Sequence, residues 1–139
     1  MDYIKHSHST GNNLHHFQWC TKYRYKMFRK EKYAEYYKDI LHMIAGEYKI
    51  AIEELAVMPD HIHIAADIPT DMSQSKAIQL LKGRSSYELF RAIPEFRLRY
   101  PKGSLWSKGN FKGSIGRVTA EVVQKYIRDQ QLSLTKFIN

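Results

Sequence analysis

Two histidines separated by one residue, His61 and His63, are the residues whose types and spacing most directly suggest chemistry. Pro59 and Asp60 come just before them and are a turn signal, and the apolar residues that follow indicate a strand. Because strand side chains alternate between faces, both imidazoles project from one side of a sheet, close enough to share a ligand. The pair therefore indicates half of a metal site. An HxH triplet is short, and a turn-capping histidine beside an ordinary half-exposed strand histidine explains it equally well.

A second triplet, His6-Ser7-His8, has no alternating apolar residues around it. Nothing in the pattern would hold these two imidazoles rigid, so residues 1–13 are predicted to be a solvated polar tail.

Hydrophobic periodicity predicts the elements that would position the His61/His63 pair. Residues 14–22 alternate as a strand with aromatic residues on one face, and residues 30–48 repeat apolar positions every three to four residues, which is typical of an amphipathic helix. Residues 50–58 form a second strand. The short turn at Pro59 and Asp60 then predicts an antiparallel hairpin with the strand that carries the histidines.

The second half of the chain is predicted to continue with helices and an irregular strand. Asp71 or Ser73 caps a helix that ends at Gly83, and a further short helix stops at Pro94. Strand pieces at 105–107 and 111–118 are interrupted by glycines, and Thr119 starts the last helix. This order predicts an α+β fold of the RRM-like or ferredoxin-like kind, an antiparallel sheet with helices mainly on one face. We expect one domain at 14–131, between the tail at 1–13 and a C-terminal tail at 132–139.

The composition suggests a partner with negative charge. The chain has 22 Lys and Arg against 14 Asp and Glu, a net charge of +8, which is the electrostatic pattern of a polyanion binder. Tyrosines alternate with the cations near residues 21–38, and cations beside flat aromatic faces suit single-stranded nucleic acid. Cys20 is the single cysteine, so no disulfide framework is expected, and no stretch is long and apolar enough for a membrane span. We expect a protein of the cytoplasm.

One polar pair on the last predicted helix shares a face. Tyr126 and Gln130 are four residues apart, together with Val122, so they lie on one stripe. By itself this spacing is more typical of a tyrosine at the edge of a core.

Several short segments occur together in an order that one family shows. They are Trp19-Cys20-Thr21-Lys22-Tyr23-Arg24, Val57-Met58-Pro59-Asp60-His61-Ile62-His63, Leu81-Lys82-Gly83-Arg84-Ser85, Leu105-Trp106-Ser107 and Tyr126-Ile127-Arg128-Asp129-Gln130-Gln131. With them the chain resembles the single-tyrosine HUH transposases of insertion-sequence-200-like (insertion sequence 200/605) elements over residues 14–131.

The resemblance implies an enzyme that cleaves and rejoins single-stranded DNA at the ends of an insertion sequence, in a prokaryotic cytoplasm at the nucleoid. It implies Tyr126 as the catalytic nucleophile, with His61, His63 and Gln130 as ligands of a divalent metal, Mg²⁺ or Mn²⁺. It also implies DNA hairpins as substrates and a homodimer in which the tyrosine helix can dock on the partner subunit. A metal at a phosphate helps a phenol to attack it, and the covalent bond to tyrosine preserves the energy of the phosphodiester. Candidate DNA contacts from the basic blocks are Lys22, Arg24, Lys82, Arg84 and Lys108.

Other functions fit the pattern less well. A histidine-triad nucleotide hydrolase needs a further histidine where the chain has Ala65, and the metallo-β-lactamase pattern HxHxDH is absent. An RRM-like RNA-binding domain suits the composition but gives no reason for Tyr126 and Gln130 to accompany a histidine pair. A domesticated relative that acts on repeated chromosomal hairpins is a nearer alternative.

Overall fold

The computed structural model describes residues 13–114 and 117–138. Its elements, in chain order, are β1 (Leu14–Thr21), the 3₁₀ turn η1 (Lys22–Arg24), α2 (Glu31–Glu47), β2 (Ala51–Val57), β3 (His61–Asp67), α3 (Gln74–Ala92), the 3₁₀ turn η2 (Pro94–Leu98), β4 (Trp106–Ser114) and α4 (Arg117–Ile138). The tail expected at residues 1–13, with His6-Ser7-His8, lies outside the described residues except for Asn13. Within the two described ranges, no helix is both long and apolar enough to cross a membrane.

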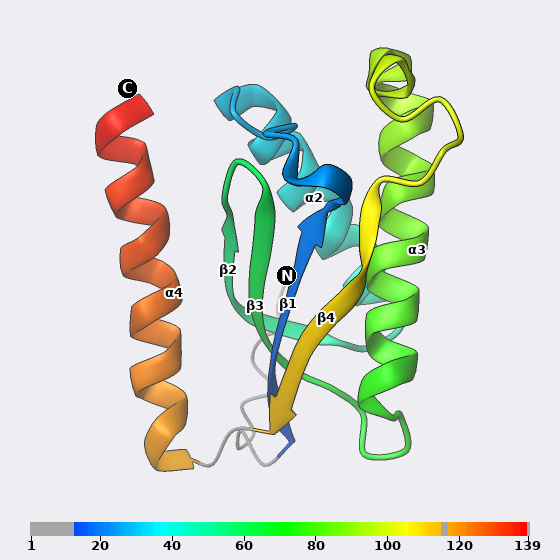
Figure 1. Cartoon of the computed structure of the whole chain (residues 1–139). Helices are drawn as coiled ribbons and strands as arrows, with labels where there is room; N and C mark the ends of the chain where they lie inside the picture. The colour runs from blue at the N-terminus through cyan, green and yellow to red at the C-terminus, as the bar shows by residue number, and fades with distance from the viewer. Residues whose placement is uncertain (1–12, 115–116, 139) are drawn as a thin grey trace.

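The four strands form one antiparallel sheet in the order β2-β3-β1-β4. The expected hairpin is present: β2 pairs with β3, and Val57 lies opposite Ile62 beside the turn at residues 58–60. Helices α2 and α3 cover one face of the sheet, and α4 lies on the other side of the molecule (Figure 1). The predicted α+β class with a ferredoxin-like sheet is confirmed.

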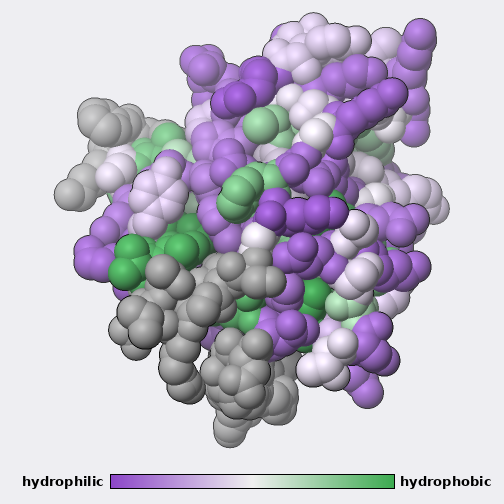
Figure 2. All heavy atoms as spheres, turned by 60° about the horizontal axis from the view of Figure 1, so that its bottom comes forward, coloured by the Kyte–Doolittle hydropathy of each residue, from purple (hydrophilic) through white to green (hydrophobic). Residues whose placement is uncertain are grey.

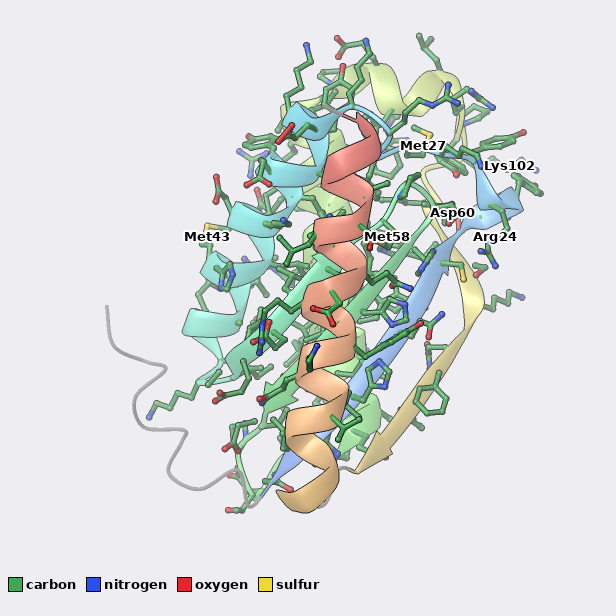
Figure 3. All side chains as sticks on the ribbon, turned by 90° about the vertical axis from the view of Figure 1, so that its left-hand side faces the viewer. Arg24, Met27, Met43, Met58, Asp60 and Lys102 are labelled. Carbon is green, nitrogen blue, oxygen red and sulfur yellow. The ribbon has the colours of Figure 1, made fainter. Side chains whose placement is uncertain are left out.

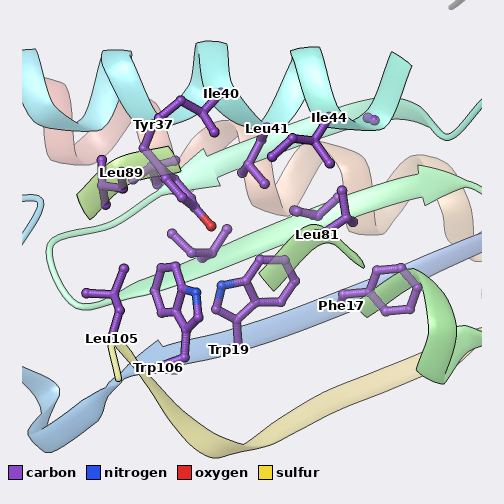
Figure 4. Packing of buried hydrophobic residues seen from close by; sticks show 14 of the residues in the cluster. Phe17, Trp19, Tyr37, Ile40, Leu41, Ile44, Leu81, Leu89, Leu105 and Trp106 are labelled. Atoms are coloured by element: carbon purple, nitrogen blue, oxygen red, sulfur yellow. The ribbon is translucent and has the colours of Figure 1, made fainter. Parts of the chain in front are cut away.

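The main core lies between the sheet and the pair α2 and α3 (Figure 4). Phe17 and Trp19 of β1 and Ile62 and Ile64 of β3 point into it and are almost completely buried, as strand alternation predicts. Tyr37 joins the two helices, because its hydroxyl lies 2.7 Å from the Ser85 hydroxyl. The side chains of the opposite parity therefore face α4.

Several element boundaries differ from the prediction. The helix expected to end at Gly83 continues to Ala92, because Leu81, Ser85 and Leu89 maintain one buried stripe across the glycine. Ser73 caps this helix by accepting a hydrogen bond from the Lys76 N–H at 3.0 Å. The two predicted strand pieces are a single strand, β4, and residues from 117 onward belong to α4, which continues past residue 131 to Ile138.

Candidate active site

His61 and His63 lie on the face of the sheet that α4 covers. Their neighbour of the same parity, Ala65, is fully buried in a small cluster with Ala56 and Ile127, the α4 residue that packs on the sheet. The two imidazole centroids are 4.9 Å apart with an interplanar angle of 81°. His63 is buried, whereas His61 at the start of β3 is partly exposed. The two rings therefore converge at one place that solvent can reach.

The turn before β3 holds His61 in orientation. Asp60 Oδ1 lies 2.8 Å from His61 Nδ1, and Asp60 Oδ2 accepts a hydrogen bond from Arg24 Nε at 3.1 Å. Figure 3 shows the Arg24 and Asp60 side chains meeting at this end of the sheet. Burial raises the pKa of Asp60, but the hydrogen bonds from His61 and Arg24 outweigh it, so this pKa lies below its ordinary value. Asp60 is therefore a carboxylate that keeps His61 Nδ1 occupied.

His63 is held by a third histidine, His16 of β1. His16 Nε2 lies 3.3 Å from His63 Nδ1, and the rings stack with centroids 5.6 Å apart. Burial, together with the smaller effects of the neighbouring His61 and His16, lowers the pKa of His63 to about 4. Burial also lowers the pKa of His16. His63 is thus a neutral imidazole at neutral pH, and its Nε2 is the nitrogen that His16 does not contact.

Tyr126 and Gln130 reach the same place from α4. The Tyr126 ring meets the His63 ring edge-on, with centroids 5.9 Å apart and an interplanar angle of 89°. Gln130 Nε2 donates a hydrogen bond to the Tyr126 hydroxyl oxygen at 3.0 Å. Tyr126 is 53% exposed, so its hydroxyl is accessible to a substrate. The spacing of four on a helix does place the two side chains together, as predicted.

Polar contacts fix α4 on the hairpin. Gln131 Oε1 accepts a hydrogen bond from the Val57 N–H at 2.7 Å, and Arg128 forms an ion pair with Glu54 at 3.1 Å. Ile127, next to Arg128, is fully buried against Ala56 and Ala65. The contacts lie on β2 and its end, so α4 is positioned by the same hairpin that carries the histidines.

The residues present fit a divalent metal with nitrogen and oxygen ligands. Among the described residues, no group of three His, Cys, Asp and Glu side chains could hold a metal, so the histidine pair needs a further ligand of another kind. Gln130 offers one: its Oε1 is buried and has no hydrogen-bond partner. A buried amide oxygen without a partner is uncommon and calls for an explanation such as an ion. A ligand set of two imidazoles and one amide oxygen suits Mn²⁺ better than it suits Mg²⁺.

The predicted DNA-contact residues fall in different places. Arg24 lies beside the site through Asp60, and Lys22 precedes it in the same turn. Lys82 of α3 binds the Ser107 carbonyl and the Asn110 side chain on β4. Arg84 binds Glu47 and the Tyr48 hydroxyl at the end of α2, on the face away from α4, and Lys108 is exposed on β4. The structure thus brings Arg24, through Asp60, next to His61, and it places Arg84 elsewhere.

Comparison with known proteins gives the family. The family model described as "Transposase IS200 like" matches residues 9–130. The chain belongs to this transposase family. The ISDra2 transposase TnpA of Deinococcus radiodurans is 31% identical over 116 residues, which cover 84% of this chain and 82% of that protein.

Solved structures support the same fold. A crystal structure of a proposed transposase from Deinococcus radiodurans R1 matches with a TM-score of 0.68 and 30% identity, covering 85% of this chain and 90% of that one. A REP-associated tyrosine transposase bound to a REP hairpin matches with a TM-score of 0.64 and 13% identity, covering 87% of this chain and 67% of that one. The second similarity concerns the fold alone.

Three side chains at the site make contacts that the sequence-based hypothesis did not include. The sequence placed Asp60 in a turn and Gln131 in a family motif, and it placed His16 only within the first strand. Their contacts depend on which strands are neighbours and on the docking of α4. Strand alternation over residues 14–22 places His16 on one face of its strand, but its contact with His63 also depends on the register of β1 against β3.

Proposed function

We propose that this IS200-like transposase cleaves and rejoins single-stranded DNA at the ends of an insertion sequence, through a covalent bond between Tyr126 and a DNA 5′-phosphate. The observation that carries the proposal is the meeting of Tyr126 with the histidine pair: its ring lies 5.9 Å from that of His63, and Gln130 binds its hydroxyl. Nucleophile and phosphate-binding groups belong together in phosphoryl transfer.

In the proposed first step, the Tyr126 oxygen attacks the scissile phosphorus. The bond from phosphorus to the 3′-oxygen of the upstream nucleotide breaks, and that oxygen leaves and takes up a proton to become a free 3′-hydroxyl. The downstream strand stays attached to Tyr126 by its 5′-phosphate. Because the Tyr126 oxygen accepts the hydrogen bond from Gln130, the phenolic proton is not engaged in that bond and can pass to solvent.

The histidines and Gln130 provide the environment for this attack. An ordinary phenol has a pKa near 10, and a phosphodiester repels anions, so the step needs positive charge at the phosphate. A divalent metal held by the Nε2 atoms of His61 and His63 and by Gln130 Oε1 would supply that charge when bound. Asp60 and His16 occupy the two Nδ1 atoms, so each imidazole keeps one fixed orientation.

The second step reverses the first with a different strand. The 3′-hydroxyl of another strand attacks the phosphotyrosine phosphorus, a new phosphodiester forms, and Tyr126 recovers its proton. The sequence of two exchanges is a transesterification and consumes no nucleotide triphosphate.

We propose hairpin-containing single-stranded DNA as the substrate. The net charge of +8 suits a polyanion, and a protein of similar fold was solved bound to a REP hairpin. A domesticated activity on repeated chromosomal hairpins would use the same chemistry.

We also propose a homodimer in which α4 can dock on the partner subunit. On α4, Val122 is 66% and Leu132 is 55% exposed, which leaves apolar surface for a second chain to cover. Figure 2 shows apolar side chains gathered on the α4 side of an otherwise largely hydrophilic face. The helix contacts the sheet through β2 and β3, and an identical helix can make the same contacts.

The test is the formation of a denaturation-resistant adduct. The protein is incubated with Mn²⁺ or Mg²⁺ and single-stranded DNA from the element's ends, labelled at the 3′ end in one sample and at the 5′ end in another. We expect the 3′ label to migrate with the protein on a denaturing gel and the 5′ label to be released in a shorter strand.

Variants assign the roles. Tyr126→Phe should form no adduct, and His63→Ala should form none while still binding DNA. Tyr87→Phe is the matched control, since Tyr87 is an exposed tyrosine on α3 that the mechanism does not use. An adduct with Tyr126→Phe would contradict the nucleophile assignment. Titration of the metal-free protein with Mn²⁺ should show binding that is lost in His63→Ala.

A further inference from the structure

A strained turn lies directly beside the candidate active site. Tyr23 has φ 64° and Arg24 has φ 55°, two consecutive residues in the left-handed region that glycine or asparagine adopts more readily. Strain of this kind persists only where surrounding contacts impose it, and it concentrates at functional sites. The turn leaves the Tyr23 side chain on the surface, where Tyr23 is 67% exposed.

Hydrogen bonds on both sides hold this turn. The Lys22 N–H donates to the Leu105 carbonyl at 2.8 Å, and the Tyr100 hydroxyl donates to the Lys22 carbonyl at 2.7 Å. The Thr21 hydroxyl donates to the Tyr25 carbonyl at 2.7 Å. The left-handed conformation is therefore built into the fold, and Tyr23 is presented on a rigid base.

The turn forms one wall of a pocket of about 180 Å³, and the loop at residues 99–104 forms the other. Its lining is Lys22, Tyr23, Arg99, Tyr100, Pro101, Lys102 and Ser104. Three of these residues are cationic. Among the described residues, no acidic side chain lines the pocket. The volume is below the roughly 300 Å³ of a site for a drug-sized molecule and suits a single ring system. We call this the Tyr23 pocket.

Aromatic rings and cations are interleaved around the pocket. The Tyr23 ring lies 5.4 Å from that of Tyr25, which in turn lies 5.4 Å from Tyr100. The Arg99 guanidinium stacks on Tyr25 at 4.0 Å, so its charge is held at the pocket. Exposed aromatic faces with positive charge are what unpaired bases and their phosphates require.

A short chain of contacts connects the turn to the histidine pair. Arg24 binds Asp60, and Asp60 binds His61 Nδ1. Figure 3 shows Arg24, Asp60 and Lys102 in the same corner of the molecule. When a DNA strand has one phosphate at the histidine pair, a neighbouring nucleotide of the same strand can therefore reach the Tyr23 pocket.

We propose that the Tyr23 pocket binds an unpaired base of the DNA strand near the cleaved phosphate, with Tyr23 as its stacking surface and Lys22 and Lys102 at the adjoining phosphates. The inference rests on the proposed function for the identity of the substrate. Base binding would give the strained turn a function, because the cleavage chemistry at Tyr126 provides no reason for the turn's conformation.

The test compares two strands of equal length, a fluorescent oligothymidine and an abasic sugar-phosphate strand, bound to the full chain without divalent metal. We expect wild type to prefer oligothymidine by roughly 5- to 150-fold in Kd, the range for one base stacked on an aromatic side chain. Tyr23→Gly should remove most of this preference. Because glycine relieves the left-handed strain, this variant should melt at or above the wild-type temperature, which excludes unfolding as the cause.

Matched variants separate stacking from charge. Tyr23→Phe should keep the preference. Tyr87→Ala should keep it too, although it removes another exposed tyrosine that, like Tyr23 with Lys22, has a cation over its ring. Lys102→Ala should weaken the binding of both strands alike. It should also reduce the salt dependence of binding by about one phosphate contact.

Three results would overturn the pocket. The first is that Tyr23→Gly prefers oligothymidine over the abasic strand as strongly as wild type does. The second is that Tyr87→Ala loses this preference as fully as Tyr23→Gly, and the third is that wild type itself shows no preference.

The first result together with a normal Tyr126 adduct would overturn the pocket and leave the proposed function standing. Loss of preference in Tyr23→Gly without any wild-type adduct would support the pocket and count against the proposed function. Absence of binding to either strand would count against both.

Discussion

Each histidine of the pair has one ring nitrogen in a polar contact and one left for a ligand. Asp60 contacts Nδ1 of His61, and His16 contacts Nδ1 of His63. Such outer contacts set which nitrogen carries the proton and how the ring is turned. The positions of Asp60 and His16 therefore explain why these two imidazoles can act together.

Replacing Asp60 tests that explanation. Asp60→Ala should lower the rate of adduct formation by about 10- to 100-fold, the usual cost of losing such a contact. The Kd for single-stranded DNA should change much less, since the phosphate-binding cations remain. Rates from gel assays and Kd from fluorescence anisotropy give both values. Asp71→Ala, at an exposed loop aspartate, is the control, and a wild-type rate in Asp60→Ala would refute the role of Asp60.

His15, on the opposite face of β1 from His16, predicts a pH effect on stability. Gln74 Nε2 donates to His15 Nδ1 at 2.7 Å, and His15 Nε2 lies 3.0 Å from Asn13 Oδ1, so the neutral ring satisfies both contacts. Burial lowers its pKa below the ordinary 6.5. The unfolded chain therefore binds this proton first as pH falls, and the stability that neutral His15 contributes is present above about pH 6.5 and lost below it.

Urea unfolding at a series of pH values measures this contribution. Between about pH 7.5 and pH 5, the free energy of unfolding should fall more steeply in wild type than in His15→Gln, because glutamine at position 15 does not titrate in this range while the other histidines are common to both proteins. Parallel pH profiles for the two proteins would show that His15 is not involved.

At the residue scale, alternation in a strand and spacing in a helix were enough to predict that His61 faces the same way as His63 and that Tyr126 lies beside Gln130. The two pairs are more than sixty residues apart, and their meeting was expected only from resemblance to a family. The roles of Asp60 and His16 could not be predicted, because they depend on the contact of a turn with a ring and on the pairing of β1 with β3.

Among the elements, the predicted end of α3 is wrong. Gly83 was expected to end the helix, yet its cost inside a helix is only about 1 kcal/mol. Leu81 and Leu89 bury one stripe on both sides of it, and the burial of a single leucine contributes more than that cost. Packing against the sheet, which the local sequence does not reveal, decided the outcome.

Gly83 therefore offers a simple stability prediction. It is exposed, and a Cβ built on it meets nothing within 4 Å. Gly83→Ala should raise the free energy of unfolding by about 1 kcal/mol, because alanine loses less backbone entropy in a helix. Urea denaturation measures the change, and a lower stability than wild type would mean that α3 is strained at this point.

At the scale of the whole molecule, the sheet separates two tasks. The face toward α2 and α3 carries the large buried residues, and the face toward α4 carries the histidines. The antiparallel ferredoxin-like sheet could be predicted from the order of the elements. The side on which α4 docks could not, since the periodicity of a helix shows that it has an apolar face and not which surface that face meets.

The proposed dimer makes a prediction for mixtures. Tyr126→Phe and His63→Ala are each expected to be inactive, but if α4 docks on the partner, a mixed dimer contains one complete site. Co-refolding equal amounts should then restore about one quarter of the wild-type adduct, because half of the dimers are mixed and each has one complete site of two. An inactive mixture, with mixed dimers demonstrated, would restrict Tyr126 to the site of its own chain.

The central claim is that Tyr126 forms the covalent bond to DNA, and peptide mass spectrometry tests it most directly. After reaction with single-stranded element ends, nuclease digestion and trypsin should leave a nucleotide on the peptide Tyr126-Ile127-Arg128, which Lys125 and Arg128 delimit. We predict the added phosphate and nucleotide mass on this peptide alone. The same mass on a different tyrosine peptide, or strand cleavage with no modified peptide, would contradict it.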